Sequence, residues 1–513
     1  MRTLVVTGEP LTVDDVVDVA RLRAQVELGS GVAARMEPSR GVVADAVGRH
    51  DVVYGVTTGF GALADTSVSG EDLVRMQHAL LRSHAAGIGE PLADDVVRAM
   101  LLLRARTLAA GLSGVRVDLP WRLLELLRLG LLPVVPSQGS VGASGDLAQL
   151  AALALPLIGE GRLRRAGAPD PLGRPAARLL AEHGLEPLRL APKEGLSLLN
   201  GTEPMQVLLA LAVHDAEVLT RVADVACAMS VEGLLGTDRP YDERVQVIRP
   251  HPGQLASAAN LRRLLAGSPL MASHRESRHA VQDSYALRCA PQVHGAVRDV
   301  LAHCRGVIER ELGSVVDNPV VVADGEVMTT GNFHGQPLAF AADMLAIAMA
   351  EIASISERRA YRMLDPATSR GLPPFLAPDA GTNSGFMLAQ YTAAAVVSEN
   401  KVLCHPASVD TIPTSGNQED HVSMGWHAVR KATDVLVNVR TVVAVELLCA
   451  AQALDLRAST AVPGPATSAV RDEIRQEVPM MDVDREVTPQ IASVARRLDQ
   501  MAAAAERVVG KLT

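Results

Sequence analysis

The chain has 513 residues and a formal net charge of −9. It contains no block of five or six like charges, which argues against nucleic acids and anionic membrane surfaces as partners. Hydrophobic residues make up 48% of the chain but aromatic residues only 2%. A large core is possible at this length, and it must be built mainly from Ala, Leu and Val, which suits closely packed helices.

The five cysteines are scattered and form no Cys-x-x-Cys pair, so neither a zinc site nor a disulfide framework is indicated, and no metal is expected. This usage predicts a reducing cytoplasm as the compartment. Glu9 and Asp14 come too early for a secretory signal peptide. The most apolar long stretch, Pro337 to Ile355, contains Asp343 and Glu351, which favours a buried helix over a membrane span.

In chain order, the first 50 residues are predicted to form a short strand followed by helices, and residues 54–66 and 133–146 are predicted to be loops. After Asn200 the apolar residues recur at helical spacing over long segments. These segments are well above the mean helix length of about 11 residues. We therefore predict a mainly α fold, with a smaller mixed N-terminal lobe at 1–199 and a long-helix core with C-terminal helices at 200–513. The long segments are Pro204–Leu235, Pro291–Leu312, Pro337–Leu364, Ser384–Leu403 and His421–Leu454.

The segment from Gly139 to Asp146 reads Gly-Ser-Val-Gly-Ala-Ser-Gly-Asp and is the most unusual in the chain. Its glycines permit a tight loop, because glycine adopts positive φ without a steric penalty. A phosphate-binding P-loop would need Lys and then Ser or Thr after the last glycine, where this chain has Asp146. A serine-hydrolase elbow would need a glycine at that position, two residues after Ser144. A simpler alternative is that Ser144 or Asp146 caps the helix predicted to follow.

A cap does not explain why three small residues, Ala143, Ser144 and Gly145, stand together at the tip of the loop. In a sharply bent chain the Gly145 amide nitrogen can approach the Ala143 carbonyl carbon. Cyclisation with loss of water would give a five-membered imidazolone ring, and dehydration of Ser144 would leave a methylidene group on it. Large side chains at 143 or 145 would crowd this closure. The triplet therefore predicts an electrophile made from the chain itself.

Seven segments, in this order along the chain, resemble the aromatic amino acid ammonia-lyases, the family of the histidine and phenylalanine ammonia-lyases. The resemblance covers most of the chain, from about residue 50 to about residue 455. It implies that the triplet becomes 4-methylidene-imidazol-5-one (MIO), with no external cofactor. It also implies a fumarase/aspartase-like fold and a homotetramer whose active sites combine residues of three subunits, with both predicted parts in one catalytic unit. The segments are Tyr54–Gly61, Ser83–Gly87, Gly139–Leu147, Leu199–Thr202, Gln282–Arg288, Gly331–Gly335 and Asn417–His421.

These matches imply roles in removing ammonia from an α-amino acid, a reaction in which the β carbon loses a proton. Tyr54 matches the base, and the alternative is a core tyrosine with a bonded hydroxyl. A free phenol has a pKa of about 10, so this tyrosine would need an unusual site to act near neutral pH. Arg288 matches the holder of the substrate carboxylate, through its bidentate guanidinium, with a structural ion pair as the alternative. Asn200, Gln282 and Tyr285 match residues that hydrogen-bond the ring or the substrate.

Three further residues are expected around the substrate. Phe333 matches the residue packed beside the cofactor, with a plain core phenylalanine as the alternative. His84 matches a position that contacts the substrate ring in histidine- and tyrosine-specific members. Glu419 is more informative, because a carboxylate can accept an imidazole N–H and would be poorly satisfied against a bare phenyl ring; the phenylalanine and tyrosine branches usually carry Gln there. The alternative is that Glu419 stabilises the N-terminus of the helix predicted to begin at His421 through its negative charge.

The reaction expected from these residues is the conversion of L-histidine to trans-urocanate and ammonia. A tyrosine ammonia-lyase or an aromatic amino acid 2,3-aminomutase is the main rival. A non-catalytic structural homologue is a third possibility, against which the intact triplet and Tyr54 argue. Departures from the usual family pattern at Thr57, Gln149, Ala152 and Glu203–Gln206 remove no catalytic group but leave the substrate and the lyase or mutase outcome open.

Overall fold

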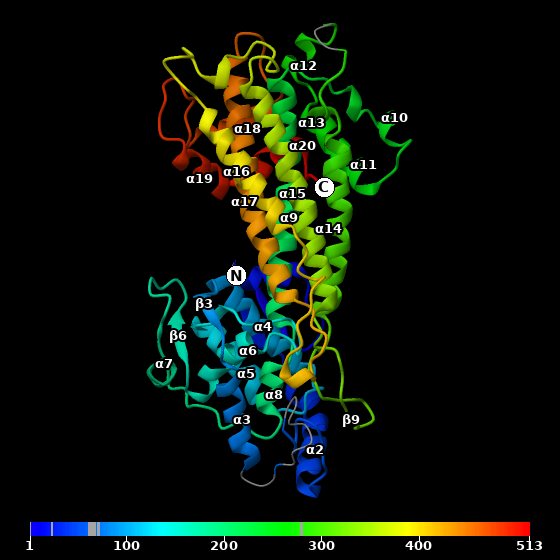
Figure 1. The fold of residues 1–513 in the computed structure, drawn as a ribbon, viewed down its shortest axis with the longest axis vertical. Helices are drawn as coiled ribbons and strands as arrows, with labels where there is room; N and C mark the ends of the chain where they lie inside the picture. The colour runs from blue at the N-terminus through cyan, green and yellow to red at the C-terminus, as the bar shows by residue number, and fades with distance from the viewer. Residues whose placement is uncertain (1, 22–23, 60–67, 69–71, 278–280) are drawn as a thin grey trace. The chain divides into compact units, whose positions relative to one another are not determined.

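The computed structural model describes residues 2–21, 24–59, 68, 72–277 and 281–513. Within these residues the chain is mainly helical, as predicted, and its strands are short (Figure 1). The last two residues of the Tyr54 segment, Phe60 and Gly61, lie outside the described residues.

The chain divides into two compact units, and four long helices each contribute residues to both. The sequence predicted a single boundary after residue 199; the observed division differs because each unit is assembled from three separate stretches of chain. Unit 1 comprises Met1–Leu211, Arg305–Asp343 and Pro406–Arg430, and unit 2 comprises Ala212–Cys304, Met344–His405 and Lys431–Thr513. The four shared helices are α9 (Glu203–Gly233), α14 (Ala290–Leu312), α15 (Gln336–Leu364) and α17 (Gly425–Leu456).

The long helices predicted from the apolar spacing are all present, the fifth being α16 (Met387–Leu403) in unit 2. On α15 the predicted apolar face is buried, with Leu338, Leu345 and Ile352 fully enclosed. Among the described residues, α15 is the one helix whose length and composition would also suit a membrane span. Most of its apolar stretch, 61%, is buried inside the protein, in agreement with the predicted buried helix.

Unit 1 combines short helices with small sheets. The parallel pair β1–β2 and the antiparallel pairs β3–β5 and β8–β9 are two-stranded, and β4, β6 and β7 form one antiparallel sheet in that order. Helix α4 is buried along most of its length. The strands are β1 (Thr3–Val6), β2 (Gln25–Leu28), β3 (Ile88–Pro91), β4 (Leu131–Pro133), β5 (Pro136–Gln138), β6 (Arg162–Arg165), β7 (Arg174–Pro175), β8 (Val320–Val321) and β9 (Val327–Met328).

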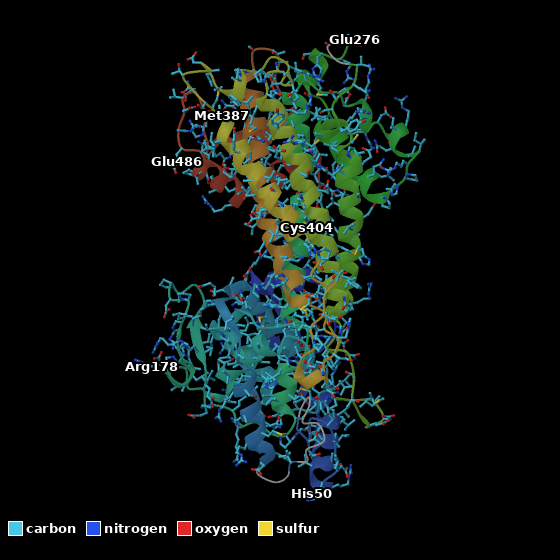
Figure 2. The ribbon with its side chains drawn as sticks, viewed as in Figure 1. His50, Arg178, Glu276, Met387, Cys404 and Glu486 are labelled. Atoms are coloured by element: carbon cyan, nitrogen blue, oxygen red, sulfur yellow. The ribbon has the colours of Figure 1, made fainter. Side chains whose placement is uncertain are left out.

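Local sequence explains several helix ends in unit 1. Thr12 caps α1 through a reciprocal pair of hydrogen bonds with Asp15. Helix α2 ends at Arg49, and the next residue, His50, labelled in Figure 2, turns the chain with a φ of 58°. The helices are α1 (Val13–Ala20), α2 (Val32–Arg49), α3 (Asp72–His84), α4 (Asp94–Ala109), α5 (Asp118–Leu129), α6 (Leu147–Ala154), α7 (Ala176–Glu182) and α8 (Glu194–Leu199), with 3-10 turns η2 (Leu155–Ile158) and η5 (Ser415–Asn417).

Unit 2 contains most of the length of the four shared helices, with shorter helices in the connections between them. Helices α11, α12 and α18 carry proline in the first turn, where its missing N–H costs no hydrogen bond. The remaining elements are η3 (Arg239–Tyr241), α10 (Glu243–Gln246), α11 (Pro252–Leu264), α12 (Pro269–Ser273), α13 (Tyr285–Arg288), η4 (Pro374–Leu376), α18 (Pro465–Arg475), α19 (Thr488–Arg496) and α20 (Leu498–Val509).

The core of unit 2 encloses a buried ion network. Arg359 of α15 pairs with Glu446 of α17 at 2.5 Å, and both side chains are fully buried. Asp224 of α9 accepts hydrogen bonds from His294 (2.7 Å) and Arg298 (2.6 Å) of α14. Burial alone would raise the pKa of Asp224, but Arg298 and His294 hold it below its usual value. Four more side chains complete the network, Ser230 and Ser356 on Glu446, and Ser257 and Asn260 on Asp224.

Candidate active site

The glycine loop lies in unit 1 between β5 and α6, and its backbone bends sharply at the triplet. Gly139, Gly142 and Gly145 have φ values of 128°, 70° and 77°. Ser144 also has positive φ, at 51°. For a residue other than glycine this left-handed conformation costs about 1–2 kcal/mol, so surrounding contacts must hold it. Two successive left-handed residues therefore shape the end of the triplet.

Gly145 is packed so closely that no other residue fits. Asp146 donates its backbone N–H to the Gly201 carbonyl at 2.9 Å, which draws the two chains together. A Cβ on Gly145 would lie 2.0 Å from the Gly201 oxygen. On Gly142, a Cβ would lie 2.3 Å from the Ser423 hydroxyl. The glycines thus serve close approach as well as positive φ.

Neither residue proposed as a helix cap caps α6 with its side chain. Asp146 occupies the N-cap position, but its carboxyl makes no hydrogen bond to the first turn of α6. Its carboxyl is fully buried and accepts hydrogen bonds from the Ser140 hydroxyl (2.6 Å) and the Met205 amide (3.0 Å). Burial raises the pKa of Asp146 to about 7. The Ser144 hydroxyl donates elsewhere, to Glu419. Both side chains therefore serve the loop rather than the helix.

The atoms that would form the ring are free to react. Among the described residues, neither the Gly145 N–H nor the Ala143 carbonyl has a hydrogen-bond partner. The side-chain Oδ1 of Asn200, next to Gly201, is buried and likewise unpartnered within the described part of the chain. A buried polar atom without a partner is costly, and such an atom beside this loop fits a group that forms later. The loop therefore fits the ring that the triplet predicts.

Glu419 lies against the triplet. Its Oε1 accepts the Ser144 hydroxyl at 2.9 Å, and its Oε2 accepts the Thr414 hydroxyl at 2.8 Å. His84, at the end of α3, is close enough for the Glu419 charge to act on it. Burial lowers the pKa of His84, while the Leu80 carbonyl and Glu419 oppose that shift. Ser144, Glu419 and His84, predicted from three distant segments, are thus brought together.

The alternative role for Glu419, as a carboxylate at a helix N-terminus, is not observed. Helix α17 begins at Gly425 rather than at the predicted His421. The intervening residues are used to hold the glycine loop: Ser423 donates its hydroxyl to the Gly142 carbonyl at 2.8 Å, and Met424 donates its amide to the Val141 carbonyl at 2.9 Å. Glu419 therefore lies outside the first turn of α17.

The Phe333 segment approaches the same loop. The Gly335 amide donates to the Gly142 carbonyl at 3.2 Å. His334 stacks on His421 with ring centroids 5.9 Å apart. Phe333 itself is half-buried, so it is not an ordinary core phenylalanine. Its predicted place beside the cofactor stays a prediction.

Tyr54 occupies a tight turn in unit 1. Gly55 has a φ of 68°. The Thr57 hydroxyl accepts the Val53 amide at 2.9 Å and donates to the Asp51 carbonyl at 2.5 Å. Thr57, a departure from the family pattern, thus anchors the turn. Tyr54 is half-buried rather than enclosed in the core, and its role as the base stays a prediction.

Gln282, Tyr285 and Arg288 belong to unit 2, on and just before α13. The Tyr285 side chain is 71% exposed. The Arg288 guanidinium lies over its ring, 4.7 Å from the centroid. Within the described ranges no carboxylate pairs with Arg288, and its Nε is buried without a partner. The alternative of a structural ion pair is therefore not observed among the described residues, and the predicted role of Arg288 toward a substrate carboxylate stays a prediction.

Three other side chains of unit 2 hold this segment, one of them the network residue Arg359. Tyr241 donates its hydroxyl to the Leu287 carbonyl at 2.8 Å, and Arg359 donates to the Ala286 carbonyl at 3.3 Å. Arg370 pairs with Asp283 at 2.8 Å. Tyr285 and Arg288 thus project from a backbone whose carbonyls are fixed.

Several supporting residues were missed from the sequence. Arg104 and Glu203 form a fully buried ion pair at 2.9 Å, and Arg104 also donates to the Asn200 carbonyl at 2.9 Å. Glu203, which departs from the usual family pattern directly after the Asn200 segment, was the one sign of this pair in the sequence. Thr414, which binds Glu419, gave no such signal.

Comparisons with known proteins agree with this geometry. A sequence model of the family described as aromatic amino acid lyase matches residues 11–476. The histidine ammonia-lyase of Anaeromyxobacter dehalogenans is 51% identical over 98% of this chain and 99% of its own length. That of Deinococcus radiodurans is 52% identical over 94% of this chain and 91% of its own length.

Solved structures of this family have the same fold. Histidine ammonia-lyase from Trypanosoma cruzi gives a TM-score of 0.91 at 40% identity, over 99% of this chain and 96% of that one. Tyrosine aminomutase from Streptomyces globisporus gives 0.93 at 38% identity over 100% of both chains. The match over nearly the whole length, together with the bent triplet and its neighbours, shows that this chain belongs to the aromatic amino acid lyase family.

Proposed function

We propose that this chain is a histidine ammonia-lyase that converts L-histidine to trans-urocanate and ammonia. The observation that carries the proposal is the Glu419 carboxylate, whose Oε1 lies 2.9 Å from the Ser144 hydroxyl. An acceptor at this position can bind an imidazole N–H beside the reacting residue, whereas a phenyl ring would leave it unsatisfied. The full-length relatives described above, which are about half identical to this chain, carry the same name.

The chemistry requires help at two points, because the amino group is a poor leaving group and the β proton is barely acidic. MIO formed from Ala143, Ser144 and Gly145 would supply the electrophile that captures the amino group. Tyr54 would take the β proton as general base. Asn200, with its free Oδ1, would support the ring by hydrogen bonding.

The remaining residues would bind and orient the substrate. Arg288, unpaired within the described ranges, would hold the carboxylate through two parallel N–H bonds. Gln282 and Tyr285 would hydrogen-bond the reacting groups. His84 would face the imidazole together with Glu419, and Phe333 would pack beside the ring cofactor.

A homotetramer with active sites shared between subunits is part of the proposal. Tyr285 is 71% exposed, and large apolar residues on three long helices are also exposed, among them Phe340, Tyr391 and Val437. Exposed apolar surface of this kind is typical of an interface. We further propose a cytoplasmic location; all five cysteines are free thiols.

A substrate panel tests the proposal. Purified protein is given histidine, tyrosine or phenylalanine, conjugated products are followed by ultraviolet absorbance, and β-amino acids are followed by chromatography. Urocanate from histidine is the expected result, and coumarate or cinnamate without urocanate would contradict it. Intact mass tests the cofactor, because ring formation removes two waters from the chain, and an unmodified mass would contradict the mechanism.

An aminomutase is the second candidate, favoured by the close structural likeness to a tyrosine aminomutase. Both activities use the same captured amino group, and the mutase returns ammonia to the β carbon. A β-amino acid as the main product of the panel would establish this alternative.

A further inference from the structure

The two ends of a short turn in unit 1, Thr414 and Glu419, face each other as a bonded pair. Thr414 donates its amide to the Glu419 carbonyl at 2.9 Å, and Glu419 donates its amide to the Thr414 carbonyl at 3.3 Å. This exchange of both backbone bonds makes them an antiparallel pair. Side chains of such a pair emerge on the same face, which brings the threonine hydroxyl to the carboxylate.

The turn between them is strained. Ser415, Gly416 and Asn417 have consecutive positive φ values of 51°, 61° and 68°. Such residues persist only where their surroundings fix them. The backbone pair at the ends of the turn provides this constraint, and the side-chain bond between Thr414 and Glu419 adds to it.

The carboxylate of Glu419 has two oxygens, and each accepts one hydroxyl. Oε2 accepts the Thr414 hydroxyl at 2.8 Å, and Oε1 accepts the Ser144 hydroxyl at 2.9 Å. The two donors have different fates. Thr414 keeps its hydroxyl, whereas formation of the ring removes the hydroxyl of Ser144 as water. After ring formation Oε2 is still bonded and Oε1 has lost its donor.

We propose that Thr414 is a positioning residue that holds Glu419 by Oε2 and so reserves Oε1 for the N–H of the substrate ring. The inference rests on the proposed function, since it concerns the same carboxylate. It adds that the orientation of this carboxylate is set by a threonine five residues earlier, across a strained turn. The Ser144 hydroxyl occupies the substrate's place on Oε1 until the ring forms.

Three variants test the role. Thr414→Val keeps the β-branched shape and removes the hydroxyl, and Thr414→Ser keeps the hydroxyl. Ser415→Ala is the matched control, because the exposed Ser415 hydroxyl has no partner within the described residues and belongs to the same turn. Each variant is purified whole and assayed for intact mass, circular dichroism, and kcat and KM with histidine.

We expect Thr414→Val to lose two waters like the wild type and to raise KM by about 10- to 100-fold, the range for a hydrogen bond to a charged group. The value of kcat should fall less, because the carboxylate binds the substrate ring in the ground state as well. Thr414→Ser and Ser415→Ala should stay within about threefold of the wild type.

Two results would overturn the positioning role. One is a Thr414→Val enzyme with the wild-type KM. The other is a Thr414→Val enzyme whose mass shows no loss of water, which would place Thr414 in ring formation instead. Failure of the proposed function looks different, because the wild type itself would then give no urocanate from histidine.

Discussion

The ion network of unit 2 and the glycine loop of unit 1 are both rich in buried polar groups, but they satisfy them differently. In the network, Glu446 and Asp224 each accept hydrogen bonds from several side chains. Around the loop, the Asn200 Oδ1 and the Gly145 N–H have no partner among the described residues. Buried carboxylates with several donors stabilise one arrangement of helices. The unpaired groups beside the strained Ser144 lie where we propose that the ring forms.

The largest expected effect is a loss of activity without a loss of stability, on substitution of Ser144 in the glycine loop. Ser144→Ala should reduce urocanate formation by about 10³-fold or more, because no hydroxyl is left to eliminate and no methylidene can form. The melting temperature should stay close to that of the wild type, since alanine meets the same backbone strain. Absorbance of urocanate, intact mass and thermal melting are measured together. Activity near the wild-type level would remove the loop from the chemistry.

A substitution in the ion network should lower the stability of the protein and leave ring formation intact. Glu446→Gln leaves the buried Arg359 charge without its partner, which costs about 3–5 kcal/mol. Thermal melting should show this loss, while molecules that fold should still lose two waters by mass. An unchanged melting temperature would show that the network is not the stabilising element that its pairing indicates.

Glu419→Gln tests the carboxylate that bonds the Ser144 hydroxyl. We expect kcat/KM for histidine to fall by about 100-fold, because an amide is a weaker acceptor than a charged carboxylate. Asp420→Asn, which alters the exposed neighbouring carboxylate, is the control. Comparable turnover by Glu419→Gln and the wild type would assign Glu419 to a structural role.

Asp146 offers a test by pH. Burial raises its pKa from 3.8 to about 7, so the folded chain keeps a proton that the unfolded chain releases. Its contribution to stability is complete below about pH 4 and is lost as pH rises through about 7. Between about pH 5 and pH 7, unfolding should become easier by about 2 kcal/mol relative to Asp146→Asn.

The Asp146 comparison is best made in a Ser144→Ala background, so that both proteins lack the ring. Urea or thermal unfolding at several pH values gives the difference. Parallel pH profiles for the two proteins would show that Asp146 is ionised in the folded chain.

The smallest effect is expected at Tyr241, which holds the backbone of the Arg288 segment. Tyr241→Phe removes the hydrogen bond to the Leu287 carbonyl and should cost about 1 kcal/mol of stability. Tyr361→Phe, on a partly exposed tyrosine, is the control for loss of a hydroxyl. Thermal melting of both variants decides whether the buried bond carries this energy, and equal melting temperatures would show that it does not.

The sequence predicted the long helices well, because apolar spacing and early prolines act locally. It placed the start of α17 at His421, four residues too early, because Ser423 and Met424 are held by the glycine loop through tertiary contacts. Local propensity carries no information about such contacts.

The sequence predicted the site residues that lie in the matched segments, but not the contacts that hold them. Ser144, His84 and Glu419 meet as expected, whereas the capping roles of Asp146 and Glu419 are absent. The Thr414–Glu419 bond could not be predicted, because it depends on three consecutive left-handed residues, of which only Gly416 adopts that conformation readily. The catalytic and binding roles of all the predicted site residues are still predictions.

The partners that hold the loop are far along the chain, and this has a consequence for biosynthesis. Glu419 follows Ser144 by 275 residues, and Ser423 follows Gly142 by 281. At ribosomal rates of about 5–20 residues per second, these residues emerge roughly 15–60 s after the triplet. A nascent chain therefore carries an ordinary Ala-Ser-Gly sequence, and we expect the proposed ring to form only when most of the protein has been made.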